Sequence, residues 1–214
     1  MSDTQPHTLT LVRHGHTQWT DSGEVAGRSD IDLSSEGRDA VTQLARTASA
    51  SLSIQNWHCS PLQRTRQTTQ LLREGMSSGI TLPDVQFDDR LVELDFGDWE
   101  GMTWAAVHEQ YDAEMAAWGE DWINRCPPNG ETFAQLVARC DAWLNEQMPE
   151  GALQADTLVV LHGGTIRALI CLCLGWPLTR AMSFTADLAR VSQLSFDQKN
   201  RKWVARSINS VMLP

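Results

Sequence analysis

The sequence has little of what a membrane protein or a nucleic-acid-binding protein needs. Its longest apolar run, residues 168–174, is far shorter than the roughly 20 residues that cross a bilayer. Its 17 Lys and Arg residues are outnumbered by 27 Asp and Glu residues, for a formal net charge of -10. Nucleic acids and anionic membranes attract clustered positive charge, so we expect neither as a partner. An anionic ligand would have to meet a locally basic pocket.

Cysteine is scarce, and the five cysteines are odd in number. None forms a CxxC motif or a Cys/His pair with the spacing of a zinc site, so we predict no metal, no cofactor and reduced thiols. Residues 1–7 are polar and lack both a basic start and an apolar stretch, which argues against a signal peptide. We therefore expect a cytoplasmic protein.

The 214 residues fit one domain, residues 1–214, with 42% hydrophobic residues to build a core. Hydrophobic patterning predicts strands at residues 8–12, 55–59, 157–161, 188–196 and 202–208, and helices at residues 36–50, 102–122, 131–147 and 165–174. Strands alternating with helices indicate an α/β fold, a three-layer α-β-α sandwich with a mostly parallel central sheet. The connection at residues 197–201 resembles a hairpin and predicts an antiparallel strand. The tryptophan-rich residues 100–130 are interpreted as a small helical lid insertion.

Two segments repeat one design, a buried strand followed by histidine and glycine. His14 and Gly15 follow the first strand, and His162 and Gly163 follow the strand at residues 157–161. Ligands bind outside the carboxyl ends of strands in open α/β sheets, and the first amides of a following helix attract anions. A lone histidine is more often structural, but two such units favour an anion site.

Two further segments carry charged residues in apolar surroundings. Arg64 begins a helix and can offer a planar fork to phosphate oxygens, whereas Arg66, two positions on, must point elsewhere. Residues 91–101 embed four acids among apolar residues, and a carboxyl there could act as general acid. This reasoning does not rank the four, which are Glu93, Asp95, Asp98 and Glu100.

These segments together resemble the histidine phosphatase superfamily, the phosphoglycerate-mutase-like proteins. Residues 13–17 are similar to its Arg-His-Gly-x-Thr signature, residues 60–68 to its Ser-x-Leu-x-Arg-x-x-Gln-Thr segment, and residues 161–163 to its second histidine. The resemblance implies a metal-independent phosphatase with a phosphohistidine intermediate on a small-molecule phosphate ester. It implies catalytic roles for five residues: His14 as nucleophile, Glu93 as proton donor, and Arg13, Arg64 and His162 as ligands of the phosphoryl oxygens.

The resemblance also predicts substrate contacts at Gly15, Thr17, Thr20, Gly27 and Gly163. Two positions depart from the family pattern. Thr20 stands where the family commonly has asparagine, so that substrate contact is either weakened or replaced by the Thr20 hydroxyl. His16 stands where glutamate is frequent, which adds a titratable group close to the site.

The spacing of the motifs bears on the substrate. The 69 positions from Glu93 to His162 are few for a mutase, which favours hydrolysis. Residues 93–100 and the motifs within residues 117–131 resemble bacterial alpha-ribazole-5'-phosphate phosphatases of cobalamin nucleotide-loop assembly, which implies a dimethylbenzimidazole nucleotide. Exposed lid tryptophans could stack on its base, although core packing explains each tryptophan equally well. A broad-specificity phosphatase and a phosphoglycerate-mutase-type phosphotransferase remain alternatives.

Other classes fit less well. A non-catalytic phosphate-binding or docking module would be expected to have lost a catalytic position, and all five are present. A metal-dependent hydrolase would be favoured by histidines at i, i+4, which are absent. A cysteine phosphatase needs an arginine closely following the cysteine in a phosphate-binding loop, and neither Cys59 nor Cys171 has this context. The oligomeric state stays open, a homodimer included.

Overall fold

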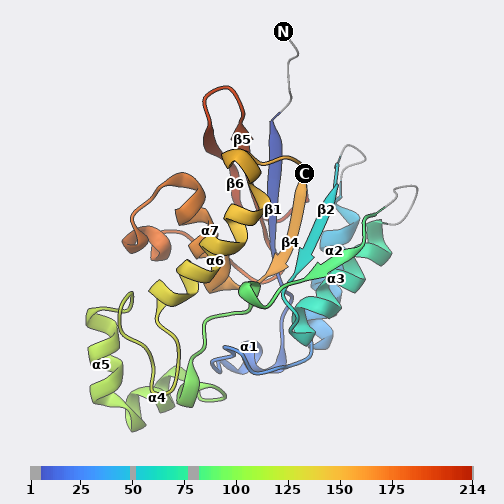
Figure 1. Ribbon diagram of the computed structural model, residues 1–214. Coiled ribbons are helices and arrows are strands. Elements are labelled where there is room, and N and C mark those ends of the chain that lie inside the picture. Colours follow the sequence, from blue (N-terminus) through green and yellow to red (C-terminus); the bar gives the residue numbers. More distant parts are fainter. Residues whose placement is uncertain (1–5, 49–51, 77–81, 214) are drawn as a thin grey trace.

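A six-stranded mixed sheet forms the centre of the computed structural model, which describes residues 6–48, 52–76 and 82–213 (Figure 1). The strands are β1 (His7–Arg13), β2 (Asn56–Cys59), β3 (Val85–Phe87), β4 (Thr157–Leu161), β5 (Val191–Asp197) and β6 (Lys202–Ser210), in the order β3-β2-β4-β1-β5-β6. β1, β2, β3 and β4 pair in parallel, while β5 is antiparallel to both of its neighbours. The predicted mostly parallel sheet with one antiparallel strand is confirmed.

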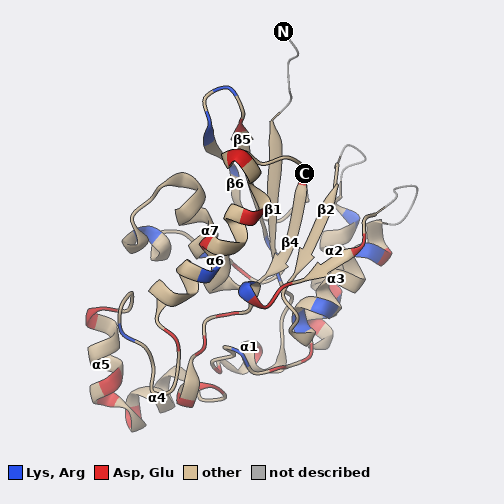
Figure 2. Ribbon diagram, in the orientation of Figure 1, with Lys and Arg blue, Asp and Glu red and all other residues tan. Residues whose placement is uncertain are grey.

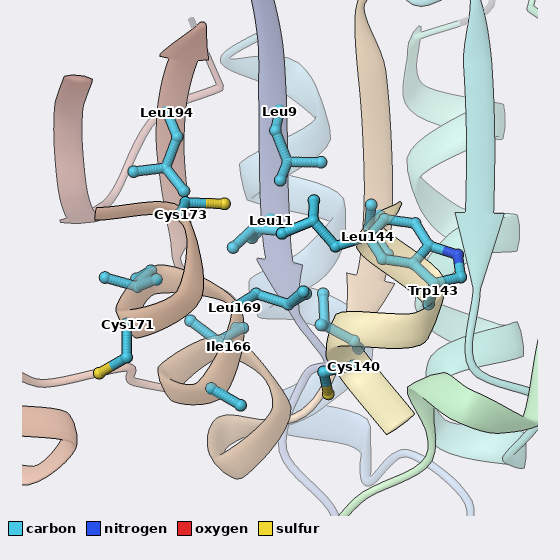
Figure 3. Close-up of a cluster of buried hydrophobic side chains, with 14 of the residues drawn as sticks. Leu9, Leu11, Cys140, Trp143, Leu144, Ile166, Leu169, Cys171, Cys173 and Leu194 are labelled. Carbon is cyan, nitrogen blue, oxygen red and sulfur yellow. The ribbon is translucent and has the colours of Figure 1, made fainter. Parts of the chain in front are cut away.

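Helices cover both faces of this sheet, which confirms the three-layer architecture. One face carries α2 (Ser35–Arg46) and α3 (Gln63–Met76), and the other carries α6 (Phe133–Gln147) and α7 (Gly163–Leu174). The alternation of side chains along β1 explains the two cores. Leu9 and Leu11 pack toward α6 and α7 in the cluster that Figure 3 shows, whereas Val12 joins the cluster with α2 and α3. Complete burial of each leucine stabilises the fold by about 2 kcal/mol.

Several predicted boundaries were wrong, each for a local reason. The helix expected over residues 36–50 ends at Arg46, and Ala50 lies outside the described residues. The helix expected over residues 102–122 is two helices, α4 (Trp104–Gln110) and α5 (Asp112–Glu120), because Tyr111 leaves helical geometry at φ -129° and ψ 38°. The last predicted helix begins two residues early, at Gly163, where His162 takes an extended N-cap conformation.

The α4–α5 segment lies beyond the carboxyl ends of the strands, near the short helix α1 (Gln18–Ser22) (Figure 1). Residues 101–103, which precede α4, are hydrogen-bonded to the loop after α1. Glu24 and Thr103 form an antiparallel bridge, the Val25 N–H donates to the Met102 carbonyl at 2.9 Å, and the Gly101 N–H donates to the Val25 carbonyl at 2.9 Å. The carboxyl edge of the sheet is thereby bordered by two segments far apart in the sequence. Across residues 6–48, 52–76 and 82–213, every helix is too short or too polar to span a bilayer.

Candidate active site

A cavity of about 360 Å³ lies at the carboxyl ends of β1 and β4. The two strands are parallel neighbours, so the residues that follow them are adjacent. The walls combine basic, acidic and aromatic side chains: Arg13, His14, Thr20, Glu24, Arg64, Glu93, Phe96, Trp104, Trp118, Trp122, Phe133, Arg167 and Met182. Glycines at positions 27, 163 and 164 and the apolar residues Val25, Ala26 and Leu94 complete the lining.

His14 lies on the cavity wall and is 3% exposed. Its Nδ1 lies 2.7 Å from the Gly15 carbonyl oxygen, and since a carbonyl can only accept, Nδ1 carries the proton. Nε2 therefore holds the free lone pair. Burial, and then the charges of Arg64 and Arg13, keep the His14 pKa well below its ordinary value of 6.5. The geometry thus provides a neutral imidazole with a fixed tautomer.

His162 is completely buried and lies behind the cavity wall. Its Nδ1 accepts a hydrogen bond from Arg64 Nε at 3.2 Å, so Nε2 carries the proton, which it donates to Ser60 Oγ at 2.8 Å. The His14 and His162 rings meet edge to face with centroids 5.1 Å apart. Both ring nitrogens of His162 are therefore occupied, and the predicted contact with a phosphoryl oxygen requires one of these bonds to be exchanged.

Arg64 is 1% exposed and is held by backbone carbonyls. Its Nη1 donates to the Ser29 carbonyl at 2.7 Å and its Nη2 to the Gly27 carbonyl at 2.6 Å. With Nε on His162, three of its five N–H groups are used and two remain for a ligand. Burial lowers the Arg64 pKa to about 10, which leaves the group charged at neutral pH.

Arg13 is the second fixed cation on this wall. Its Nη1 donates to the Ala186 carbonyl at 2.6 Å, while its buried Nε has no partner. Burial lowers its pKa, and the nearby Glu93 charge opposes that effect. Arg66, by contrast, lies away from the cavity with its guanidinium 4.0 Å from the centre of the Phe87 ring.

Glu93 is the acid of residues 91–101 that lines the cavity. Its Oε1 accepts from the Leu94 N–H at 2.9 Å and its Oε2 from the Gly164 N–H at 3.0 Å, in the first turn of α7. The other three acids serve the loops around it. The Asp95 side chain accepts a hydrogen bond from the Gly97 N–H, and the Asp98 side chain accepts one from the Asn129 amide. The Glu100 carboxylate accepts the N–H groups of residues 28 and 29. Geometry thus ranks Glu93 first, which the sequence pattern did not.

The predicted substrate-contact residues divide into two groups. Thr20, Gly27 and Gly163 line the cavity. At Gly163 a Cβ atom would lie 3.2 Å from Arg13 Cζ, so this glycine lets the arginine approach. Gly15 and Thr17 do not line the cavity.

The space beside Gly15 and Thr17 is filled by the protein itself. A Cβ on Gly15 would lie 2.7 Å from the Gly37 carbonyl oxygen, and the Thr17 hydroxyl accepts the Thr20 N–H at 3.1 Å as the N-cap of α1. His16 also turns away, with Nδ1 3.0 Å from Asp21 Oδ1. Its side chain lines a different cavity, beside α2.

An aromatic wall completes the cavity on the α4–α5 side. Trp104 and Trp118 are stacked, with ring centres 6.2 Å apart and an interplanar angle of 22°, and Trp122 packs against Phe133. Trp99 meets the first two rings edge-on but is fully buried, so core packing is its role.

Arg167, on α7, is a cavity residue that the sequence analysis missed. It follows Gly163 and Gly164 by four and three positions, which puts it on the same helix face. That spacing was the available signal.

The cavity concentrates positive charge in an acidic protein. Three guanidinium groups and two carboxylates line it, while the whole chain has a formal charge of -10. Figure 2 shows acidic segments on α5 and in the loops near α4. Fixed guanidinium groups beside a neutral imidazole can bind a phosphoryl group and stabilise the charge that develops during its transfer. Histidine, cysteine and carboxylate side chains within the described ranges form no group of three or more that could hold a metal ion.

The family model for the histidine phosphatase superfamily (branch 1) matches residues 9–210. Phosphoserine phosphatase 1 of Hydrogenobacter thermophilus is 30% identical over 191 residues, covering 89% of this chain and 87% of the relative. A 2,3-bisphosphoglycerate-dependent phosphoglycerate mutase of Bartonella bacilliformis is 32% identical over 167 residues, covering 76% of this chain and 79% of the relative.

Among solved structures, the alpha-ribazole phosphatase of Shigella flexneri superimposes with a TM-score of 0.84 at 27% identity. The match covers 97% of this chain and 98% of that structure. The resemblance to alpha-ribazole phosphatases noted in the sequence is confirmed, and so is the fold.

Proposed function

Because this chain belongs to the histidine phosphatase superfamily and acts as a phosphatase, we propose that it hydrolyses small-molecule phosphomonoesters through a phosphohistidine on His14. The observation that supports this most directly is the state of His14. Its Nδ1 proton is held by the Gly15 carbonyl, its Nε2 is free, and burial, followed by the charges of Arg64 and Arg13, depresses its pKa. A nucleophilic imidazole needs this combination of tautomer and neutrality.

The first step joins Nε2 of His14 to phosphorus and breaks the bond between phosphorus and the ester oxygen. Glu93 lines the cavity, and its carboxyl accepts a hydrogen bond from the Gly164 N–H. In this step Glu93 donates its proton to the leaving alcohol. In the second step a water attacks the phosphohistidine, and Glu93 accepts a proton from that water. The products are the alcohol and inorganic phosphate, and His14 returns to its neutral form.

Arg13 and Arg64 stabilise the phosphoryl group throughout. Charge spreads over its equatorial oxygens in a loose transition state, and preorganised N–H donors that need not reorient bind that charge well. Both guanidinium groups are fixed by backbone carbonyls before any substrate arrives. In this scheme they supply the charge stabilisation that other phosphatases obtain from a metal ion.

The proposed substrate is a nucleoside 5'-phosphate with a flat aromatic base, alpha-ribazole 5'-phosphate. Its support is the aromatic wall, where Trp104, Trp118 and Trp122 line the cavity. Trp104 is 42% exposed and can cover a flat ring, which a serine or glycerate leaving group does not offer. The alpha-ribazole phosphatase of Shigella flexneri has the same fold over nearly the whole chain.

A second candidate is phosphoryl transfer to another substrate, favoured by the likeness to a phosphoglycerate mutase. Hydrolysis takes precedence because the chain is also similar to phosphatases and has only 69 positions between Glu93 and His162.

The decisive experiment measures turnover of alpha-ribazole 5'-phosphate, p-nitrophenyl phosphate, O-phosphoserine and 3-phosphoglycerate in the presence of EDTA. We expect hydrolysis of the ribazole ester to have the highest kcat/KM. His14→Ala is expected to lose at least a thousandfold in kcat, whereas His16→Ala, two residues away but outside the cavity, keeps activity. Loss of activity with EDTA would overturn the metal-independent mechanism. Absence of turnover of every ester would favour the binding module, and 2-phosphoglycerate formed from 3-phosphoglycerate would favour the mutase.

A further inference from the structure

Arg167 is a cation on the cavity wall that the phosphatase mechanism leaves unused. It lies on α7, one turn after Gly163 and Gly164. Side chains in a helix lean toward its N-terminus, so Arg167 reaches back over the turn whose Gly164 amide holds Glu93. With Glu93 as the proposed donor to the ester oxygen, this direction points Arg167 toward the leaving-group side of the phosphoryl site.

Arg167 has a buried donor without a partner. Its Nε is buried without a hydrogen-bond partner, and its Nη2 reaches the Phe184 carbonyl only at 3.4 Å. No carboxylate of the described ranges forms an ion pair with it. The positive charge of Arg167 contributes to lowering the pKa of Arg13, after the larger effect of burial. A buried donor left unpaired is costly, and on the wall of a cavity a ligand can supply the missing acceptor.

Charge balance indicates which kind of ligand group this is. The cavity carries three guanidinium charges, from Arg13, Arg64 and Arg167. When Glu93 holds its proton as general acid, the Glu24 carboxylate and a phosphomonoester dianion already supply three negative charges. A further carboxylate on the substrate would exceed the positive charge, whereas neutral hydroxyl oxygens would not.

We propose that Arg167 is a specificity-determining residue that donates hydrogen bonds to hydroxyl oxygens of a sugar between the phosphoester and the aromatic base. This deepens the proposed function and rests on it. The position suits the role, because Arg167 lines the same cavity as His14 and Trp122. In a nucleotide, a ribose joins the phosphate to the base, so a ligand that reaches both His14 and Trp122 brings its ribose into this cavity.

The test is a double-mutant cycle between Arg167 and the ribose hydroxyls. Wild type, Arg167→Met and Arg167→Lys are assayed with alpha-ribazole 5'-phosphate and with its 2',3'-dideoxy analogue. For wild type, removal of the hydroxyls is expected to lower kcat/KM about tenfold to a hundredfold, the worth of one or two hydrogen bonds to a charged donor. In Arg167→Met the same removal should cost less than about threefold. Arg167→Lys keeps the charge without the fork, and its loss should fall between the two.

Three controls distinguish other roles. Inorganic phosphate, as a competitive inhibitor, should bind wild type and Arg167→Met with affinities within about threefold of each other. A larger loss of phosphate affinity in the variant would mean that Arg167 binds the phosphoryl group. Arg180→Met, an exposed arginine outside the cavity, should behave as wild type in the whole cycle. The thermal unfolding midpoint of each variant reports a purely structural effect.

The inference is overturned if Arg167→Met loses equally on both esters, or if it loses only with O-phosphoserine, which would assign Arg167 to a carboxylate. Failure of the proposed function looks different. In that case wild type turns over no ester, or His14→Ala matches wild type with p-nitrophenyl phosphate.

Discussion

Glu100 and Arg64 both bind the loop of residues 27–29, Glu100 through the loop's N–H groups and Arg64 through the loop's carbonyls. The Glu100 carboxylate accepts the N–H groups of Arg28 and Ser29, each at 2.7 Å, and the Ser29 hydroxyl. Arg64 donates to the carbonyls of Gly27 and Ser29 in the same loop. A Cβ atom on Gly27 would overlap the Glu100 carboxylate, so the loop fits closely against it. The position of the buried guanidinium therefore depends on a carboxylate that does not line the cavity.

Glu100→Gln should disturb this arrangement. Its amide nitrogen would face backbone donors, which leaves at least one N–H unpaired and costs about 1–3 kcal/mol of unfolding free energy. We expect kcat/KM to fall about tenfold or more, because Arg64 loses its fixed acceptors. Urea unfolding and steady-state kinetics measure the two effects. Glu109→Gln, on the exposed side of α4, is the matched control. Unchanged kcat/KM with lowered stability would show that Arg64 does not need this loop.

Acid should destabilise the fold through its buried imidazoles. Burial holds the pKa values of His14 and His162 well below 6.5, and it also lowers the pKa of His58. Below pH 6.5 the unfolded chain binds protons that the folded chain does not, so the unfolding free energy falls as pH falls. The slope approaches about 1.4 kcal/mol per pH unit for each fully buried histidine until its folded pKa is reached.

Urea unfolding of wild type between pH 7.5 and 5.5 checks this slope. His162→Asn should give a shallower slope, while the exposed His108→Asn should keep that of wild type. A stability that does not change over this range would mean that the imidazoles are protonated in the folded state.

The aromatic wall should contribute to binding of the substrate's base and little to binding of its phosphoryl group. Removing one ring by Trp104→Ala is expected to raise KM for alpha-ribazole 5'-phosphate about fivefold to twentyfold, the scale of one base–aromatic stack. The effect on p-nitrophenyl phosphate should be smaller, since its ring is not held by a ribose. Trp203→Ala on β6 tests whether loss of any tryptophan has the same effect. Equal effects on both esters would argue against stacking.

Iodoacetamide should alkylate one thiol of the folded protein. Cys126 is exposed, while burial raises the pKa of Cys59 to about 11 and of Cys140 to about 12, and also raises those of Cys171 and Cys173. Only a thiolate attacks iodoacetamide rapidly. Mass spectrometry of the treated folded protein should show one adduct, absent from Cys126→Ser, with activity retained. Loss of activity on alkylation would count against a histidine nucleophile.

The sequence pattern predicted the position of a site residue correctly where that position depends on a single strand. His14 directly follows a buried strand, so its place at the sheet edge followed from the pattern of β1 alone. Prediction was weaker where packing between distant segments decides. Gly15 has the form of a ligand-binding glycine, but the Gly37 carbonyl, from α2, takes that space. Arg167 has an ordinary helical context, and only the fold shows that it faces a cavity.

Both ring nitrogens of His162 are engaged by Arg64 and Ser60, whereas His14 has one nitrogen free. The two imidazoles are close neighbours, but only one can accept a phosphoryl group without first breaking a hydrogen bond. With His14 as the proposed nucleophile, we therefore expect covalent labelling to reach one phosphate per chain. The acid-labile, alkali-stable phosphate trapped by rapid quenching would be carried by the peptide that contains His14, and none would migrate to its neighbour.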